Sequence, residues 1–373
     1  MGQTAEVTAS RLRLRRSPDI RGEVITLLPR GTTVNVLGEE GEWLRIEFKG
    51  QEGFGHRDFL MKTPDHPPSS VPPRARPGEV RVNGQDVLGP DGIRFAKVFK
   101  KGVFNFGRTP IGDFVAQNRS SFPESAGSLL RIMQAVSENE GKLEAINTWD
   151  NAFLSFGAFQ WTSGPGLERG ELPAVLQRVK SLDGDAFAEY FGQHGLDVAD
   201  VRAVPGAPAT GLLTLDGQRL TSTAQKERLR TPDWAYRFWR AGHDDRVRRA
   251  QVDHAMARIQ VFYRSPARRI GERFVGDYAT SELLVALLLD QHVNRPGHVP
   301  QTLAQAIGKL QGAPADPGVW TDTQERKLCE LYLQFRALTT MTDSQKRADS
   351  IRRGVAQGLI SDRRRSFQAL LSL

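Results

Sequence analysis

A proline-rich segment divides this chain and constrains its folding more than any other feature. Residues 63–78 (TPDHPPSSVPPRARPG) contain six prolines, and each proline fixes φ and removes a backbone donor. Such a composition is typical of an extended, semi-rigid linker. We therefore predict a small domain over residues 1–62, a linker over 63–78 and a larger domain over 79–373.

The composition is that of a globular protein with an excess of positive charge. Hydrophobic residues make up 39% and charged residues 25% of the 373 positions, as in ordinary soluble domains. There are 51 basic and 43 acidic residues, a net charge of +8. That excess favours an anionic partner, which is a nucleic acid, an anionic membrane surface or a bacterial cell wall. A single cysteine, Cys329, excludes an intramolecular disulfide framework and a cysteine-cluster metal site.

Neither a membrane span nor a secretory signal is expected. No run approaches the roughly 20 apolar residues that a spanning helix needs. Residues 1–10 lack the basic and apolar regions of a signal peptide. We therefore expect a protein made in the cytoplasm without a signal peptide.

Residues 7–62 are dominated by short β-branched, aromatic or alternating runs. The clearest runs are residues 24–27, 33–37 and 43–48, and turn residues separate them. Five or six short strands joined by tight turns predict a small barrel.

The order of motifs in this segment resembles that of the bacterial SH3 family. That family tends to show Leu-x-Val-Arg-x-x-Pro, a lysine-glycine turn, a tryptophan strand and a closing Gly-Trp-x-x-x-x-Leu. The corresponding segments here are residues 12–18 (LRLRRSP), 30–31 (RG), 41–46 (GEWLRI) and 53–60 (GFGHRDFL). Phe54 stands where the family usually has tryptophan. The resemblance implies a cell-wall-binding SH3b-like barrel.

Beyond the linker, β-like patterns give way to helical ones. Residues 79–122 form a β-rich lead-in with strand candidates at 79–82 and 102–106, and helical periodicity dominates 123–373. A hairpin interrupts the helices at residues 212–220, where Asp216-Gly217 supplies the turn.

Glu140 is the most informative residue of the helical part. The apolar residues of the helix predicted over 125–140 lie within roughly 80° of Glu140 on a wheel of about 100° per residue. Glu138 projects to the opposite side, and Gly141 is a typical helix stop. A carboxyl group that faces inward at a helix C-terminus loses hydration and opposes the helix dipole, and both raise its pKa. Such a group suits general acid catalysis. Alternatively, Glu140 bends out past the helix end or pairs with an arginine.

The residues after Glu140 resemble the lysozyme-like superfamily, in its goose-type lysozyme and lytic transglycosylase branch. That branch carries Glu-Ser-x-Phe at a helix end, followed by Ser-x-x-Gly-x-x-Gly-Leu-Met-Gln. Glu140 falls on the catalytic glutamate, Leu143 on the phenylalanine and residues 157–160 (GAFQ) on Gly-Leu-Met-Gln. Gly141 replaces the serine, and the spacing from glutamate to glutamine is slightly longer than usual.

This resemblance implies an α+β, multidomain chain whose second domain is mainly α-helical, with a small β-lobe across a sugar-binding cleft. Glu140 would protonate the glycosidic oxygen. Asp150, on the opposite lobe, would act as base, nucleophile or electrostatic support, much as chitosanases of the same superfamily use a glutamate and a later aspartate. Lytic transglycosylases need no second carboxylate, so Asp150 is alternatively a turn residue.

The resemblance also implies substrate-binding roles. Ser155 would hydrogen-bond near the catalytic carboxylate, and Gln160 would orient the sugar or close the cleft. Trp149 and Trp161 would stack on sugar faces or, alternatively, pack in the core. A tyrosine from a later helix lies near the catalytic glutamate in such transglycosylases, and Tyr263 is assigned that place ahead of Tyr236 and Tyr278.

Three later segments complete the expectations. Residues 233–264 predict two helices around Gly242, with an aromatic core and a solvated basic face, or alternatively a glycan or nucleic-acid surface. The apolar run 283–289 predicts a core helix followed by a loop over 290–298, where Asn294 or Gln291 would meet N-acetyl groups. His292 and His298 lack a third ligand nearby, so no metal site is predicted. The C-terminal arginines, Arg347 among them, are expected on a solvated helix face.

These observations predict a peptidoglycan hydrolase, a muramidase or a lytic transglycosylase, that cleaves β-1,4 glycosidic bonds. Its partners would be glycan strands and stem peptides, with no nucleic acid, membrane, cofactor or metal. A phage or a secretion apparatus would deliver such an endolysin or effector to the wall. The alternatives are a chitosanase-like glycoside hydrolase and a non-catalytic wall-binding or phage- or secretion-associated structural protein.

Overall fold

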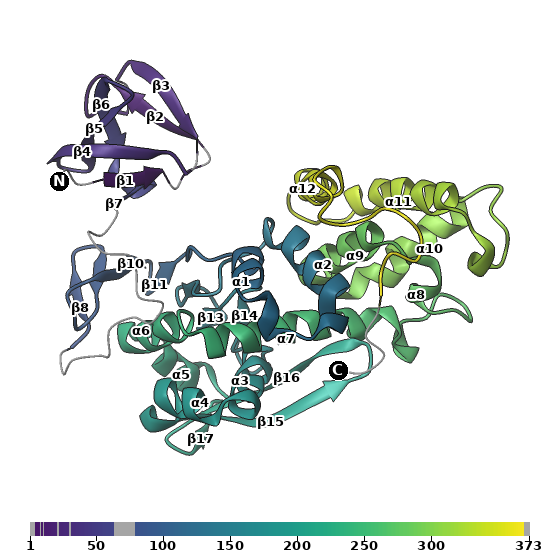
Figure 1. The fold of residues 1–373 in the computed structure, drawn as a ribbon. Helices are drawn as coiled ribbons and strands as arrows, with labels where there is room; N and C mark the ends of the chain where they lie inside the picture. The colour runs from purple at the N-terminus through teal and green to yellow at the C-terminus, as the bar shows by residue number, and fades with distance from the viewer. Residues whose placement is uncertain are drawn as a thin grey trace. The chain divides into compact units, whose positions relative to one another are not determined.

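The computed structural model (Figure 1) describes residues 4–62, except Thr8, Ser10, Arg21 and Arg30, and residues 79–368. Backbone contacts divide the chain into two units, Met1–Val71 and Pro72–Leu373. The predicted linker, residues 63–78, lies outside the described residues.

The first unit is built from short antiparallel strands. They are β1 (Thr4–Val7), β2 (Arg11–Arg15), β3 (Val24–Pro29), β4 (Thr33–Glu40), β5 (Trp43–Phe48), β6 (Gln51–His56) and β7 (Leu60–Lys62), and the short helix η1 (Arg57–Phe59) precedes β7. They pair in the order β3-β2-β6-β5-β4-β1-β7. The predicted β-rich first domain is therefore present.

Alternation of apolar and polar residues gives this sheet one buried face. In β2, Leu12 and Leu14 are buried while Arg11 and Arg13 are exposed, because successive side chains of a strand point to opposite faces. Leu12 and Leu14 join a small core of their own.

The second unit begins with a sheet that two helices interrupt in sequence. Its strands are β8 (Arg81–Asn83), β9 (Asp86–Leu88), β10 (Arg94–Phe99), β11 (Gly102–Asn105), β12 (Ile146–Asn147), β13 (Ser155–Phe156) and β14 (Trp161–Thr162). They pair in sequence order, and β12 joins β11 after the helices. β8 and β11 match the two predicted strands, and the lead-in also contains a helix, α1.

The rest of the second unit is mostly helical. Its helices are α1 (Ile111–Gln117), α2 (Gly127–Ser137), α3 (Leu172–Leu182), α4 (Gly184–Tyr190), α5 (Thr223–Glu227), α6 (Pro232–Ala241), α7 (Asp245–Tyr263), α8 (Val275–Tyr278), α9 (Glu282–Asn294), α10 (Val299–Lys309), α11 (Asp322–Ala337) and α12 (Ser344–Ala356). Within residues 4–62 and 79–368, no helix has both the length and the apolarity needed to cross a membrane.

Helix α7 runs through the second unit and contacts several elements (Figure 1). It packs against α2, α3 and the hairpin strand β16. Helix α9, whose apolar run is almost wholly buried, packs against α2, α10 and α12. The ends of α2, α9 and α12 therefore lie close together, although they are distant in sequence.

The predicted hairpin over residues 212–220 is confirmed, and a longer hairpin that was not predicted precedes it. Strands β15 (Leu196–Val204) and β16 (Ala207–Leu215) form a two-stranded ribbon, and β16 continues through a turn into β17 (Gln218–Arg219). Asp216 and Gly217 occupy that turn with φ of 52° and 75°, as a two-residue hairpin turn of type I′ requires.

Two helix ends differ from the sequence predictions. Helix α2 ends at Ser137, so Glu140 lies in the turn that follows the helix rather than in its last turn. Helix α9 continues to Asn294, so the first five residues of the predicted loop 290–298 are helical. Asn294 is the last residue of the helix, and its side-chain amide donates to the Asp290 carbonyl at 3.1 Å.

Candidate functional site

Glu140 faces the interior, as its helical position predicts. Its side chain is 9% exposed, whereas Glu138 is exposed. The Glu140 amide donates to the Ser137 carbonyl at 3.3 Å, so the turn continues the direction of α2 for one more step. The apolar face of α2 therefore still determines where Glu140 points.

Gly141 brings this turn against the segment that follows β13. Its amide donates to the Ala158 carbonyl at 2.8 Å, and a Cβ placed on Gly141 would lie 2.9 Å from that oxygen. The approach explains why a residue without a side chain follows Glu140. It also places the residue after Glu140 in contact with the segment 157–160.

An ion-pair network surrounds the Glu140 carboxylate. Arg347 of α12 donates to Glu140 and, at 2.6 Å, to Asp290 of α9. Asp290 is fully buried and also pairs with Arg336 of α11 at 2.5 Å. The prediction that Arg347 lies on a solvated face is wrong, because its side chain is only 14% exposed. The arginine alternative for Glu140 is therefore the one observed.

Burial raises the pKa of Glu140 from 4.5 to about 7, although Arg347 beside it lowers that pKa and the negative charge of Asp290 raises it again. Arg347 cannot cancel both effects because it is shared between two carboxylates. Glu140 therefore exchanges a proton near neutral pH, which is where a general acid works best.

Asp150 lies in the connection between β12 and β13 and bonds to its own turn. One carboxylate oxygen accepts from the Ala152 amide at 2.9 Å, and the other accepts from the Asn147 side chain at 2.8 Å. The bond from the Ala152 amide is that of an Asx turn. Among the described residues, no hydrogen bond or ion pair joins Asp150 to Glu140.

The predicted sugar-stacking tryptophans have different surroundings. Trp149 is half-buried against Phe99, with their ring centroids 5.0 Å apart, and the Lys100 ammonium lies 4.5 Å from its ring. Trp161 is buried against Phe159 and His254. The packing role is thus the one that the contacts of Trp161 support.

Two other predicted ligand residues lie near the Gly141 contact. Gln160 adopts a left-handed conformation with φ of 50°, and its amide donates to the Gly157 carbonyl at 2.9 Å. Ser155 is buried in β13, between Asn147 of β12 and Thr162 of β14.

The residues predicted from later helices do not contact Glu140 through any interaction within the described part of the chain. Tyr263 is buried, and its hydroxyl donates to the Ala279 carbonyl at 2.9 Å. Asn294 is exposed at the end of α9. Gln291 is fully buried and donates to Thr302 at 3.0 Å, so it belongs to the core between α9 and α10.

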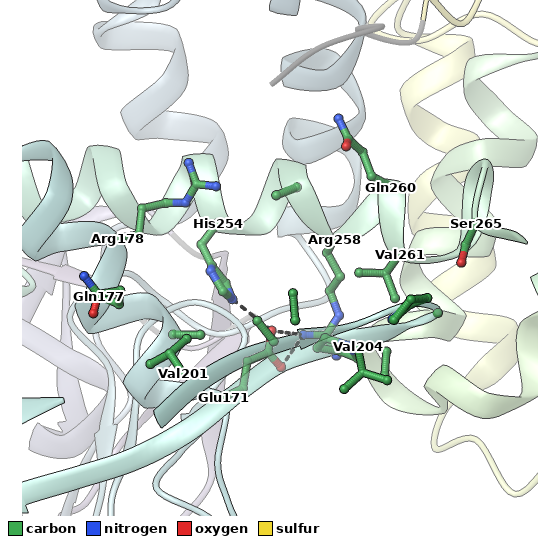
Figure 2. A pocket seen from close by; sticks show the side chains of 18 of the residues that line it. Glu171, Gln177, Arg178, Val201, Val204, His254, Arg258, Gln260, Val261 and Ser265 are labelled. Atoms are coloured by element: carbon green, nitrogen blue, oxygen red, sulfur yellow. Dashed lines mark hydrogen bonds and ion pairs between the residues drawn. The ribbon is translucent and has the colours of Figure 1, made fainter. Parts of the chain in front are cut away.

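A cavity of about 780 Å³ lies between α3, α7 and the β15–β16 hairpin. Figure 2 shows His254 and Arg258 extending from α7 to Glu171, which precedes α3. Arg258 donates to both carboxylate oxygens of Glu171 at 2.9 and 2.8 Å, and Nε2 of His254 lies 3.0 Å from one of them. Burial would raise the pKa of Glu171, but Arg258 and His254 outweigh it and hold that pKa below its usual value.

This cluster is absent from the sequence predictions. His254 and Arg258 are four residues apart on one helix and so share a face, which is the one signal that the sequence offers. The link to Glu171 joins distant segments, and no local pattern reveals it.

The cavity and the Glu140 network are electrostatically connected. Arg258 lines the cavity, and its positive charge also lowers the pKa of Glu140. Glu140 itself is not among the described residues that line the cavity. No group of three or more histidine, cysteine, aspartate or glutamate residues within 4–62 and 79–368 is arranged to hold a metal ion.

Comparisons with known proteins identify only the first unit. No curated protein and no solved structure matches this chain. Residues 10–61 match the family model of the bacterial SH3 domain. That segment covers β2 to β6 and the short helix η1. The N-terminal unit of this chain therefore contains a bacterial SH3 domain.

Proposed function

We propose that this protein is a peptidoglycan hydrolase, a muramidase or a lytic transglycosylase, in which Glu140 is the general acid. The observation that carries the proposal is a buried carboxyl group whose pKa is raised to about 7. At neutral pH such a group is partly protonated and can donate its proton to a glycosidic oxygen.

The position of Glu140 supports the same reading. The turn that holds it contacts residues 157–160 through Gly141 and Ala158, and these are the residues that resemble the lysozyme-like motif. Bacterial SH3 domains commonly bind cell-wall peptidoglycan, so the first unit would hold the enzyme on its polymer. Attachment through one unit raises the effective concentration of the other at its substrate.

Catalysis would begin with proton transfer from Glu140 to the leaving oxygen. In a hydrolase, a water molecule then completes the reaction, with or without help from a second carboxylate such as Asp150. In a lytic transglycosylase, the ionised Glu140 takes a proton back and an anhydro sugar forms. Arg347 and Asp290 would hold the Glu140 side chain in place through both steps.

A second candidate is a wall-binding protein without catalytic activity. The contact that favours it is the ion pair between Glu140 and Arg347, because buried ion pairs also perturb pKa values for structural reasons. In that case Glu140 would serve only to fix α12 against α2.

Digestion of purified peptidoglycan, with the products read by mass spectrometry, separates the candidates. We expect products from the wild type and from Glu138→Gln, an exposed carboxylate two residues away, and none from folded Glu140→Gln. Anhydro-muropeptides would identify a lytic transglycosylase, and hydrated reducing ends a muramidase. Equal product yields from Glu140→Gln and the wild type would contradict the assignment of Glu140. No products from the wild type on several wall types would favour the wall-binding protein.

A further inference from the structure

The lining of the 780 Å³ cavity is unlike a surface built to stack sugars. No tryptophan, tyrosine or phenylalanine is among the described residues that line it. Small apolar residues form much of its walls, among them Ala174, Val201, Ala203, Val204, Ala207, Ala209, Ala257 and Val261. Such walls suit methyl groups and short aliphatic chains, since stacking on a pyranose ring needs a flat aromatic face.

The cavity also has cationic groups available for a ligand. Glu171 is paired with Arg258 through both of its oxygens and offers no free negative charge. Arg258 uses NH1 for Glu171 and Nε for His292, at 3.2 Å, and its NH2 has no hydrogen-bond partner among the described residues. Arg178, on α3, lines the same cavity and forms no ion pair within the described part of the chain. The charge of Arg178 and the NH2 donor of Arg258 that remains beside its pair with Glu171 are complementary to a carboxylate carried by an aliphatic ligand.

We propose that this cavity binds an anionic aliphatic peptide, the stem peptide carried by the glycan strand. The inference rests on the proposed function for the choice of peptide, because stem peptides combine alanine methyl groups with free carboxylates. Arg258 lines the cavity and donates to His292 of α9, two residues from the Asp290 that shares Arg347 with Glu140, so a strand bound at Glu140 would place a neighbouring peptide within reach of the cavity. The second unit would then bind the stem peptide as well as the glycan strand.

Photo-crosslinking of the full chain with a synthetic stem peptide tests the location. The probe is Ala-γGlu-Lys-Ala-Ala with a diazirine on the lysine, and crosslinked residues are mapped by mass spectrometry. We expect crosslinks at the residues within 201–209 and 257–264 that line the cavity. Crosslinks confined to the bacterial SH3 domain, or none at all, would overturn the proposal.

Paired substitutions test the charge argument by titration calorimetry with the same peptide. Val204 lines the cavity and is 57% exposed, so the fold tolerates a change there. We expect Val204→Glu to raise the Kd of the peptide about tenfold and Val204→Lys to leave it equal or lower it. Arg178→Gln should also weaken binding about tenfold, whereas Lys180→Gln, on the same helix but paired with Asp197, should not. The same Kd for all four variants would exclude the cavity.

The outcome separates this proposal from the proposed function. Glu140→Gln should bind the peptide like the wild type, because Glu140 does not line the cavity. Peptide binding in the cavity without peptidoglycan cleavage would support the peptide site and contradict the proposed hydrolase function. Cleavage of glycan strands without any crosslink in the cavity would support the hydrolase function and contradict the peptide site.

Discussion

Arg347 of α12 binds the carboxylate of Glu140, although 207 residues separate the two in sequence. The same guanidinium contacts Asp290 at 2.6 Å and the Asn139 carbonyl at 2.7 Å. The C-terminal helices are therefore part of the Glu140 environment and not only a solvated addition to the core.

Sharing Arg347 between two carboxylates keeps this guanidinium bound when Glu140 changes its charge. When Glu140 takes a proton, Arg347 retains its contact with Asp290, although the network then carries one net positive charge. Removing one member of an isolated buried pair is costly because the other charge stays desolvated. Asp290 is in turn held by Arg336, which fixes the network when Glu140 is neutral.

Replacing Arg347 should shift the pH dependence of activity. Arg347 lowers the pKa of Glu140, so in Arg347→Met that pKa should rise by roughly one unit or more. The general acid would then stay protonated to higher pH. We expect the alkaline limb of the pH–rate profile on peptidoglycan to move upward from about pH 7, the pKa of Glu140 in the wild type.

Two control variants sharpen this measurement. Arg347→Lys keeps the charge and should move the limb less than Arg347→Met. Arg353→Met removes a cation from an exposed position of the same helix and should not move it. A limb that stays at the wild-type pH in Arg347→Met would show that Glu140 is not the group that titrates.

The role of Asp150 can be separated by two substitutions. Asp150→Asn keeps the oxygen that accepts from the Ala152 amide but removes the charge. Asp150→Ala removes both. If Asp150 is a turn residue, Asp150→Asn should keep nearly full activity and stability, while Asp150→Ala loses about 1 kcal/mol of unfolding free energy. Assays on peptidoglycan measure the activity of both variants, and urea denaturation measures their stability. Loss of activity in folded Asp150→Asn would instead assign a catalytic role.

Local patterns in the sequence predicted the features that depend on local geometry. The alternating run over residues 43–48 indicated a strand, which is β5, and Asp216-Gly217 identified a hairpin turn. The helical position of Glu140 correctly predicted that its side chain faces inward. The strand and the direction of Glu140 follow from backbone periods of 2 and about 3.6 residues, and the turn follows from the positive φ that Asp216 and Gly217 adopt.

Contacts between distant segments could not be predicted in this way. The partner of Glu140 is Arg347, whose surroundings in sequence are rich in arginine and indicate a solvated helix face. Asp290 directly follows a long apolar run, and that position alone suggested a loop, although the helix continues through it. The choice between a free and a paired Glu140 depends on how α2, α9 and α12 pack, which no local period specifies.

The Glu171 cluster should contribute to stability in the second unit. Glu171→Gln leaves Arg258 with weaker acceptors in a buried site, and we expect a loss of about 3 kcal/mol in unfolding free energy at neutral pH. The pKa of Glu171 is held below 4.5, so the contribution is present above that pH and is lost as the pH falls through the lowered pKa. The difference between wild type and variant should therefore shrink in acid.

Urea denaturation followed by tryptophan fluorescence at several pH values measures this difference. Glu272→Gln is the matched control, because its side chain is exposed and the change should alter stability by less than about 0.5 kcal/mol. Equal stability of Glu171→Gln and wild type at neutral pH would mean that the bonds to Arg258 and His254 do not stabilise the fold.

His292 should make the second unit sensitive to acid. Burial and the neighbouring Arg258 lower its pKa from 6.5 to about 3, and its Nδ1 accepts from Arg258. The unfolded chain binds a proton at His292 below pH 6.5 while the folded chain does not, so stability is lost as the pH falls. The loss should reach roughly 2–3 kcal/mol between pH 6.5 and about pH 4.5.

Comparison with His292→Asn isolates this effect, because asparagine does not titrate and can still accept from Arg258. Glu140 acts in the opposite direction: its raised pKa makes the folded state bind its proton more tightly, so stability falls as the pH rises from 4.5 towards 7. Measured unfolding free energies contain both effects, but the difference between wild type and His292→Asn contains only that of His292. We expect the unfolding free energy of the wild type, relative to that of His292→Asn, to fall steadily as the pH is lowered. A difference that does not vary with pH would mean that His292 is protonated alike in the folded and unfolded chains.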